Sequence, residues 1–155
     1  MTTAFHNYAS QGNVFIGQLA DELDLSDNKT HALRIFRLVF HGIRSRITPA
    51  ESLHLIYHLP SAVKAVYVDG WNIDFPQNRQ FDYEEFVDEI FKSPDNTPHK
   101  LFVKKSDVET ALNALFRALK RNLSGGEFTD LMAHLPVTLR LHLVEYMMEG
   151  QTVFL

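Results

Sequence analysis

The amino-acid sequence repeats itself, and this repeat limits the folds open to the chain more than any other feature. A shift of 76 residues aligns residues 29–68 with residues 105–144 without a gap and places Leu59-Pro60 on Leu135-Pro136. Identical residues at equivalent positions are Lys29/Lys105, Phe40/Phe116, Glu51/Glu127, Leu55/Leu131, His58/His134 and Val68/Val144. Such self-similarity indicates one unit built twice. We therefore predict a single domain over residues 1–155, with repeats at about 14–71 and 81–148.

Apolar residues within each copy recur with the period of an α-helix, about 3.6 residues. In the first copy they are Ala32, Phe36, Val39, Phe40, Ile43 and Ile47, and in the second copy Val108, Leu112, Leu115, Phe116, Leu119 and Leu123. We expect the two helices that carry these stripes to form the middle of the fold. Alternating strand patterns are essentially absent. The prediction is an all-α fold, a helical bundle of two pseudo-symmetric repeats with about four helices each.

Capping patterns mark where several helices are expected to begin. A hydroxyl or carboxylate side chain followed three residues later by a glutamate is typical of a helix N-terminus. This pattern occurs at Thr48/Glu51, Asp82/Glu85, Ser106/Glu109 and Ser124/Glu127. Phe81 and Phe86 flank the start at Asp82 and are expected to form a hydrophobic staple. Because proline lacks an N–H group, Pro60 and Pro136 are expected at the first position of short fourth helices.

The composition bears on where the protein works. None of the 155 residues is cysteine, which excludes disulfides and thiolate metal sites and weakly favours a reducing compartment. Residues 1–12 lack the features of a signal peptide, and no apolar stretch approaches the ~20 residues of a membrane span. The net charge of −4 is negative, whereas a dedicated nucleic-acid binder is usually basic. We expect a soluble cytoplasmic protein that binds neither nucleic acid nor membrane.

Local signatures of the common enzyme classes are missing from the sequence. It contains no P-loop, no nucleophile elbow, no His-Glu-x-x-His pattern and no dinucleotide-binding fingerprint. We therefore assign no catalytic residue and no cofactor, and we expect a protein without an enzymatic activity of its own. Catalysis by residues scattered along the chain stays open at this point.

A Glu/His face on each expected third helix is the clearest candidate for a metal site. Its members are Glu51, His54 and His58 in the first copy and Glu127, Asp130 and His134 in the second copy. Glu-x-x-His pairs on facing helices are how helical bundles build carboxylate-bridged metal centres. The alternative is structural, because the glutamates complete helix caps and a histidine near a helix C-terminus interacts favourably with the helix dipole. We favour the structural interpretation.

A basic stripe lies opposite the apolar stripe of the first copy. It consists of Arg34, Arg37, His41 and Arg44, and its partial equivalent in the second copy consists of Thr110, Asn113, Arg117 and Lys120. Such a stripe could receive phosphate or an acidic partner. A solvated surface is also expected on the polar side of an amphipathic helix, and this is the interpretation that we favour.

Four smaller features have both a structural and a functional interpretation. They are the basic cluster Lys100, Lys104 and Lys105, the loop Ser124-Gly125-Gly126, the aromatic pair Tyr67 and Trp71, and the final residues Val153-Phe154-Leu155. We expect the basic cluster to be solvated, and the loop to cap a helix instead of binding an anion. The aromatic pair is expected to pack between the repeats instead of anchoring a partner. For the final residues, docking a second subunit and folding back onto the domain both stay open.

Several of these residues together resemble a known family. The residues concerned are Leu59-Pro60, Tyr67-x-x-Gly70-Trp71, Glu85-Phe86, Gly126-Glu127 and Leu135-Pro136. In their order and spacing, over residues 15–140, they resemble the bacterial two-repeat helical family named domain of unknown function 2267. This resemblance implies a helical fold, and it implies no substrate, cofactor or catalytic residue.

The leading functional hypothesis is a non-enzymatic helical module that interacts with, or is accessory to, another protein. Two alternatives stay open. The first is a metal-binding bundle that uses the Glu/His faces, and the second is a weak binder of an anionic partner that uses the basic stripe. The sequence does not identify the partner or the oligomeric state.

Overall fold

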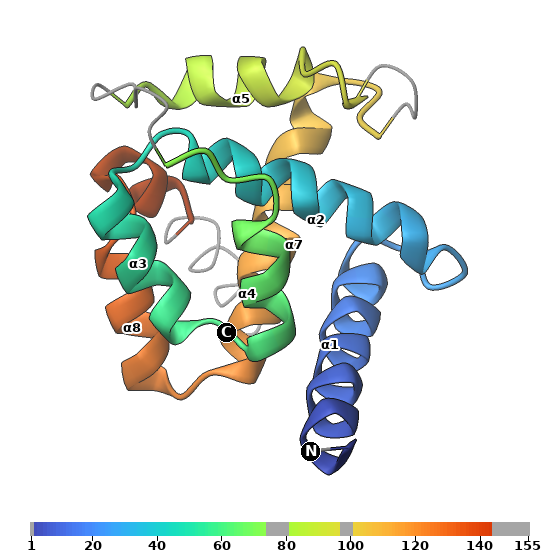
Figure 1. Ribbon diagram of the computed structural model, residues 1–155. Helices are drawn as coiled ribbons and strands as arrows, with labels where there is room; N and C mark the ends of the chain where they lie inside the picture. The colour runs from blue at the N-terminus through green and yellow to red at the C-terminus, as the bar shows by residue number, and fades with distance from the viewer. Residues whose placement is uncertain (1, 74–80, 97–100, 144–155) are drawn as a thin grey trace, which may run out of the picture.

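The computed structural model describes residues 2–73, 81–96 and 101–143 (Figure 1). The helices in these ranges are α1 (Thr2–Glu22), α2 (Lys29–Arg44), α3 (Pro49–His58), α4 (Ser61–Val68), α5 (Tyr83–Phe91), α7 (Lys105–Asn122) and α8 (Gly125–Ala133), followed by helical residues 137–143. These ranges contain no β-strand, so the predicted all-α class is confirmed. None of their helices combines the length and the apolar character that crossing a membrane requires.

Helices α2 and α7 lie at the centre of the bundle, as the apolar stripes predict. Helix α7 packs against α1, α2, α5 and α8, and α2 also packs against α1, α4 and α5. The predicted stripe residues that lie within α2 and α7 are all buried, and of the two beyond the helix ends Ile47 is buried and Leu123 is partly buried. Figure 1 shows α5 lying along α2 at the top of the view, with α3 beside α8 at the left. The core is therefore built around the two helices that carry the longest apolar stripes.

A row of four aromatic rings joins α1, α2 and α4. The ring centroids of Phe15 and Phe36 are 5.4 Å apart, those of Phe36 and Phe40 are 4.7 Å apart, and those of Phe40 and Tyr67 are 5.3 Å apart. All four side chains are at most 1% exposed. Burial of each such ring stabilises the fold by about 1.5–3 kcal/mol. The row fixes α4 against α2 and so positions the polar face of α2 described below.

Two glycines allow helices to approach each other closely. A Cβ atom on Gly42 of α2 would lie 2.7 Å from Cγ1 of Ile90 on α5. A Cβ atom on Gly12 of α1 would lie 2.7 Å from Cβ of Ala62 on α4. Carbon atoms that are not bonded prefer separations of about 3.5–4.0 Å. A side chain at Gly12 would therefore push α1 and α4 apart, and a side chain at Gly42 would require Ile90 to move.

Three of the four predicted caps are confirmed. The side chains of Thr48, Asp82 and Ser124 accept hydrogen bonds from the backbone N–H groups of Glu51, Glu85 and Glu127, at 3.1, 3.0 and 3.1 Å. The predicted staple also forms, because the rings of Phe81 and Phe86 have centroids 5.3 Å apart. Helices α3, α5 and α8 thus begin where the local sequence predicts.

The cap predicted at Ser106 is wrong. Helix α7 begins at Lys105, and the residue that caps it is Asp107. The Asp107 carboxylate accepts hydrogen bonds from the backbone N–H groups of Val103 and Lys104, both at 3.0 Å. A carboxylate accepts such bonds more strongly than a neutral hydroxyl does. The N-cap is Lys104, so the helix starts two residues earlier than the Ser106/Glu109 pattern indicated.

The two prolines of the Leu-Pro steps lie one residue outside the positions predicted for them. Pro60 is the N-cap of α4, with ψ of 150°, and helical residues after Pro136 begin at 137. In each case the proline carbonyl accepts the first helical hydrogen bond, from Lys64 N at 3.0 Å and from Arg140 N at 2.9 Å. An N-cap residue has extended ψ, which suits proline as well as the first helical position does.

Helix starts in the two halves fall 76 residues apart. Helices α2 and α7 begin at Lys29 and Lys105, and α3 and α8 begin at Pro49 and Gly125. The symmetry of the two copies and their union in one domain stay predictions. The expected end of the second copy near residue 148 and the final residues Val153-Phe154-Leu155 lie outside the described residues.

Candidate functional site

The Glu/His faces of the two predicted copies meet, because α3 and α8 pack against each other. The rings of His54 and His134 are stacked, with centroids 4.5 Å apart and planes 7° apart. His58 lies beside this stack, with its ring centroid 6.4 Å from that of His134. Three of the six candidate residues therefore come together from two helices that are far apart in the sequence.

The stacked arrangement of these histidines does not resemble a chelate. The nitrogen lone pair that would bind a metal lies in the plane of an imidazole ring. In parallel stacked rings these lone pairs run side by side and do not converge on one point. Within the ranges 2–73, 81–96 and 101–143, no three His, Asp, Glu or Cys side chains form a group that could hold a metal ion. The metal hypothesis stays a prediction that the geometry does not favour.

A pocket of about 760 Å³ opens where α3 and α7 end and α8 begins, beside α1. Residues from each of these helices line it: Ser10, Gln11, Val14, Tyr57, His58, Leu59, Pro60, Asn122, Leu123 and Glu127. It brings together His58 and Glu127, which the sequence analysis placed in separate copies. The volume lies in the range of small-molecule sites, about 300–1,000 Å³.

Large apolar side chains are exposed at the rim of this pocket. Tyr57 is 79% exposed and Val14 is 54% exposed, and both line the pocket. Leu53 lies one turn before Tyr57 on α3 and is 58% exposed. Residues four positions apart lie on the same side of a helix. Leu53 and Tyr57 therefore extend an apolar surface from the pocket along the outside of α3.

The basic stripe also gathers at one place. Arg34, Arg37, His41 and Arg44 all line a cavity of about 360 Å³, together with Leu38, Asp69, Gly70, Asp95 and Leu101. Arg44 donates hydrogen bonds to the carbonyl oxygens of Tyr67 and Asp69, at 2.7 and 2.8 Å. His41 Nε2 donates to the carbonyl oxygen of Val66 at 2.9 Å. These bonds satisfy carbonyl groups at the end of α4, which have no partner within their own helix.

Burial shifts the pKa values of two residues in this stripe. It lowers the pKa values of His41 and Arg44, and the nearby positive charge of Arg37 lowers both further. Arg37 in turn forms an ion pair with the carboxylate of Asp69, in which both side chains are about half exposed. The stripe is therefore not simply a solvated face, because it holds the end of α4 against α2.

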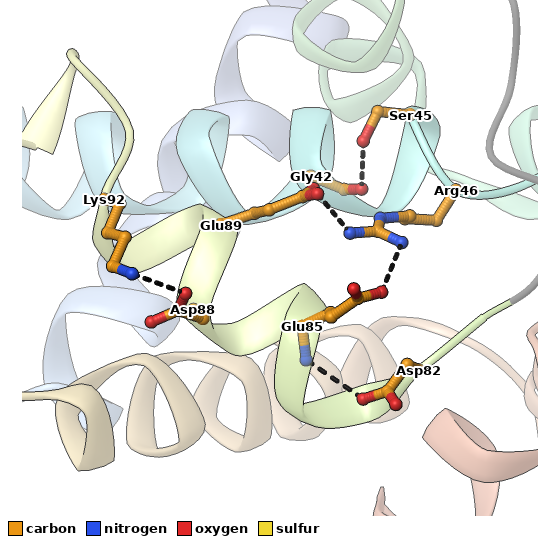
Figure 2. A network of polar contacts seen from close by, with 8 residues as sticks. All are labelled: Gly42, Ser45, Arg46, Asp82, Glu85, Asp88, Glu89 and Lys92. Carbon is orange, nitrogen blue, oxygen red and sulfur yellow. Dashed lines mark hydrogen bonds and ion pairs between the residues drawn. The ribbon is translucent and has the colours of Figure 1, made fainter.

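Arg46 is a charged residue that the sequence analysis missed. Its side chain is only 2% exposed and pairs with Glu89 at 2.5 Å and Glu85 at 3.9 Å, both on α5 (Figure 2). The sequence did contain a signal for this residue, because Glu85 and Glu89 place two carboxylates one turn apart on the same side of a helix, where they face a partner of opposite charge. Arg46 joins the end of α2 to α5, so its role is in holding the fold together.

Tyr67 belongs to the core, and its ring and hydroxyl contacts with Phe40, Trp71 and Ser52 lie within the first copy, so packing between the repeats stays a prediction. It is fully buried, and its hydroxyl forms a hydrogen bond of 2.7 Å with the hydroxyl of Ser52. Burial raises the pKa of Tyr67 to about 12. The ring of Trp71 lies edge-on to it, with centroids 6.2 Å apart. Tyr67 is therefore unavailable as a partner anchor.

The predicted basic cluster is divided between different surroundings. Lys105 forms an ion pair of 2.7 Å with Asp88, which also pairs with Lys92 at 2.9 Å. These two lysines lower the pKa of Asp88. Lys104 is exposed just before α7, and Lys100 lies outside the described residues. The cluster does not form a common basic surface in the described part of the chain.

Comparison with known families identifies the protein family of this chain. Residues 12–141 match the family described as an uncharacterized conserved protein family, DUF2267. The chain belongs to this family, which confirms the resemblance found in the sequence. A comparison with curated proteins gave no match.

Proposed function

We propose that the protein is a non-enzymatic interaction module that binds a segment of a partner protein at the pocket between α1, α3, α7 and α8. The observation that carries this proposal is the exposed apolar rim formed by Val14 and Tyr57 at a pocket of about 760 Å³, which Leu53 extends along α3. Clustered exposed apolar side chains with a polar surround are typical of protein interaction sites. Exposed tyrosines are enriched among residues that dominate binding energy.

The shape of this surface favours a protein partner. The pocket accepts one side chain, and the Leu53/Tyr57 side of α3 offers a contact for the segment that carries it.

Two further features support the proposed cellular setting, which is the cytoplasm of a bacterium. The chain has no cysteine, which fits a reducing compartment, and a bacterial source is what the sequence resemblance implies.

Site-specific photo-cross-linking tests the proposed surface. A photoreactive amino acid is placed at Tyr57 and, as a matched control, at Val103, which is 81% exposed at the opposite end of α7. In source cells, we expect one dominant protein adduct at position 57 and none of it at position 103. An excess of wild-type protein should compete for this adduct, whereas Leu53→Ser/Tyr57→Ser protein should not.

Two outcomes would contradict the interaction module. Equal cross-linking at both positions, or equal competition by the double variant, would show that this surface is not selective. Turnover of a substrate by the purified protein, lost in Glu127→Gln, would replace the proposal with a catalytic one.

An anionic partner is a second candidate, because all four residues of the predicted stripe line one cavity. Asp69 occupies Arg37 through an ion pair that is half exposed, and such pairs contribute only ~0–1 kcal/mol. An acidic segment could replace Asp69 at small cost. Titration with a polyglutamate peptide should perturb the NMR amide signals of α2 in wild-type protein and much less in Arg37→Gln. Equal perturbation in both proteins would remove this candidate.

A further inference from the structure

We infer that the pocket at the ends of α3 and α7 recognises an alkyl ammonium group, namely the lysine side chain of a partner segment. This inference rests on the proposed function and names the chemistry of the side chain that enters the pocket. It follows from the charges, the helix ends and the aromatic ring that surround the pocket.

The charged side chains at the pocket favour a cation. Glu127 supplies a carboxylate, and the described lining residues include neither lysine nor arginine. His58 is the other titratable side chain from the two Glu/His faces that lines the pocket, and its protonation would oppose a cation. Charge-assisted hydrogen bonds between ammonium and carboxylate groups are roughly twice as strong as neutral ones.

Two helix C-termini meet at the same place. Helix α3 ends at His58 and α7 ends at Asn122, and the residues that follow them, Leu59 and Leu123, also line the pocket. The last carbonyl groups of a helix carry partial negative charge, equivalent to roughly −0.5 at the C-terminus. Both ends therefore favour a positive group in the pocket.

The N-terminus of α8 also lies here, and its partial positive charge is offset locally. The hydroxyl of Ser124 accepts a hydrogen bond from the N–H of Glu127 at 3.1 Å, and Glu127 places a negative charge in the first turn. The last turn of α7 also carries Lys120 and Arg121, which lie outside the pocket lining, and Asn122 donates a hydrogen bond to the carbonyl oxygen of Ala118 at 2.7 Å. The pocket thus combines two negative helix ends with one compensated positive end.

The apolar part of the lining suits the alkyl chain of lysine. Val14, Leu123 and the ring of Tyr57 provide surface for methylene groups. The face of an aromatic ring attracts an ammonium group electrostatically. A lysine side chain combines both properties, because a flexible chain of four carbons ends in a compact positive charge.

NMR titrations of the full chain with small probes test this chemistry. The probes are hexylammonium, hexan-1-ol and hexanoate, which share an alkyl chain and differ in charge, and Nα-acetyl-lysine methylamide. We expect hexylammonium to perturb the amide signals of residues around the pocket and to bind about tenfold more tightly than hexan-1-ol. Hexanoate should bind more weakly than the alcohol.

Matched variants on α8 separate the role of Glu127 from general charge effects. Glu127→Gln should reduce the affinity for hexylammonium to that for hexan-1-ol, whereas Asp130→Asn, one turn along α8 and also exposed, should not. Denaturant midpoints of both variants establish beforehand that they fold. Tyr57→Leu should weaken hexylammonium binding about threefold and leave hexan-1-ol binding unchanged.

The outcomes distinguish this inference from the proposed function. Equal binding of hexylammonium and hexan-1-ol, or equal effects of the two α8 variants, would overturn the ammonium inference and leave an apolar interaction pocket. Binding of hexylammonium but not of the lysine derivative would overturn the lysine assignment and indicate a free amine as the ligand. Binding of no probe, with no selective cross-link at Tyr57, would overturn both proposals.

Discussion

The polar face of α2 and the polar face of α3 carry similar kinds of side chain but have different surroundings. On α2, His41 and Arg44 are partly buried and donate hydrogen bonds to carbonyl groups at the end of α4. On α3, His54 and Tyr57 are exposed, and the ring of His54 stacks on that of His134. The polar side of an amphipathic helix is therefore not solvated by default, because the unpaired carbonyl groups of another helix end can require its donors.

The equivalent positions of the second half strengthen this point. Arg117 lies 76 residues after His41, and it pairs with Glu22 of α1 at 3.2 Å. Arg121, one turn further, pairs with the same carboxylate at 2.6 Å, and the Glu22 side chain is only 12% exposed. One stripe thus binds a helix end in the first half and a carboxylate in the second half. The pattern of charges is similar, and the partner differs with the helix that packs there.

The largest expected effect concerns Arg44. Replacing it with alanine removes two charge-assisted hydrogen bonds to α4, so Arg44→Ala should lower the free energy of unfolding by about 2–3 kcal/mol. Lys120 occupies the equivalent position in the second half and is exposed, so Lys120→Ala should change it by less than ~0.5 kcal/mol. Denaturant unfolding measures both. Equal losses in the two variants would show that the face of α2 is no more structural than that of α7.

Loss of the caps should have the next largest effect. Thr48→Ala and Ser124→Ala should each lower the free energy of unfolding by about 0.5–2 kcal/mol, since each removes a bond to a helix N–H group. The two helix starts lie at opposite ends of the α3/α8 pair (Figure 1). The losses in the double variant should therefore add, and a double variant no less stable than either single variant would contradict independent caps.

The stability of the fold should also fall in mild acid because of His41. Burial lowers its pKa in the folded protein, whereas the unfolded chain binds a proton near the ordinary value of about 6.5. The unfolded state then holds more protons below that pH, so stability is full above about pH 6.5 and decreases as the pH falls. His41→Gln keeps a donor for Val66 and removes the titration.

The measurement that checks this prediction is the difference in unfolding free energy between wild type and His41→Gln at several pH values. The other histidines are common to both proteins and cancel in that difference. We expect the unfolding free energy of wild type to decrease relative to that of His41→Gln as the pH falls below about 6.5. A difference that does not vary with pH would show that His41 titrates equally in both states.

The smallest effect is expected for metal on the Glu/His faces. A metal bound only by the folded state would raise the melting temperature by mass action. Because the stacked histidines do not converge on one point, zinc, manganese and iron(II) should leave the melting temperature of the wild-type protein unchanged. The same ions should also leave the melting temperatures of His54→Ala and His58→Ala unchanged. Stoichiometric metal that survives dialysis and is lost from His58→Ala would show that the rings rearrange into a site.

Local hydrogen bonds explain which predictions from the sequence were correct. Thr48, Asp82 and Ser124 each bond a residue only three positions away, so the pattern of neighbours is sufficient to place the start of a helix. The pattern at Ser106 failed because the Asp107 carboxylate accepts the N–H groups of Val103 and Lys104, so the helix starts before Ser106. Where two local patterns overlap, the charge of the acceptor decides between them.

The sequence by itself determined the all-α class, the starts of α3, α5 and α8 and the stripes that form the core, because periodicity and capping depend on residues within about one helical turn. Only the tertiary structure decided what each polar face touches. His41 bonds a carbonyl group 25 residues away, and Arg117 pairs with a carboxylate 95 residues away. The pocket likewise needs the ends of three helices and the side of a fourth. Such contacts depend on how several apolar surfaces are buried together, which no local pattern specifies.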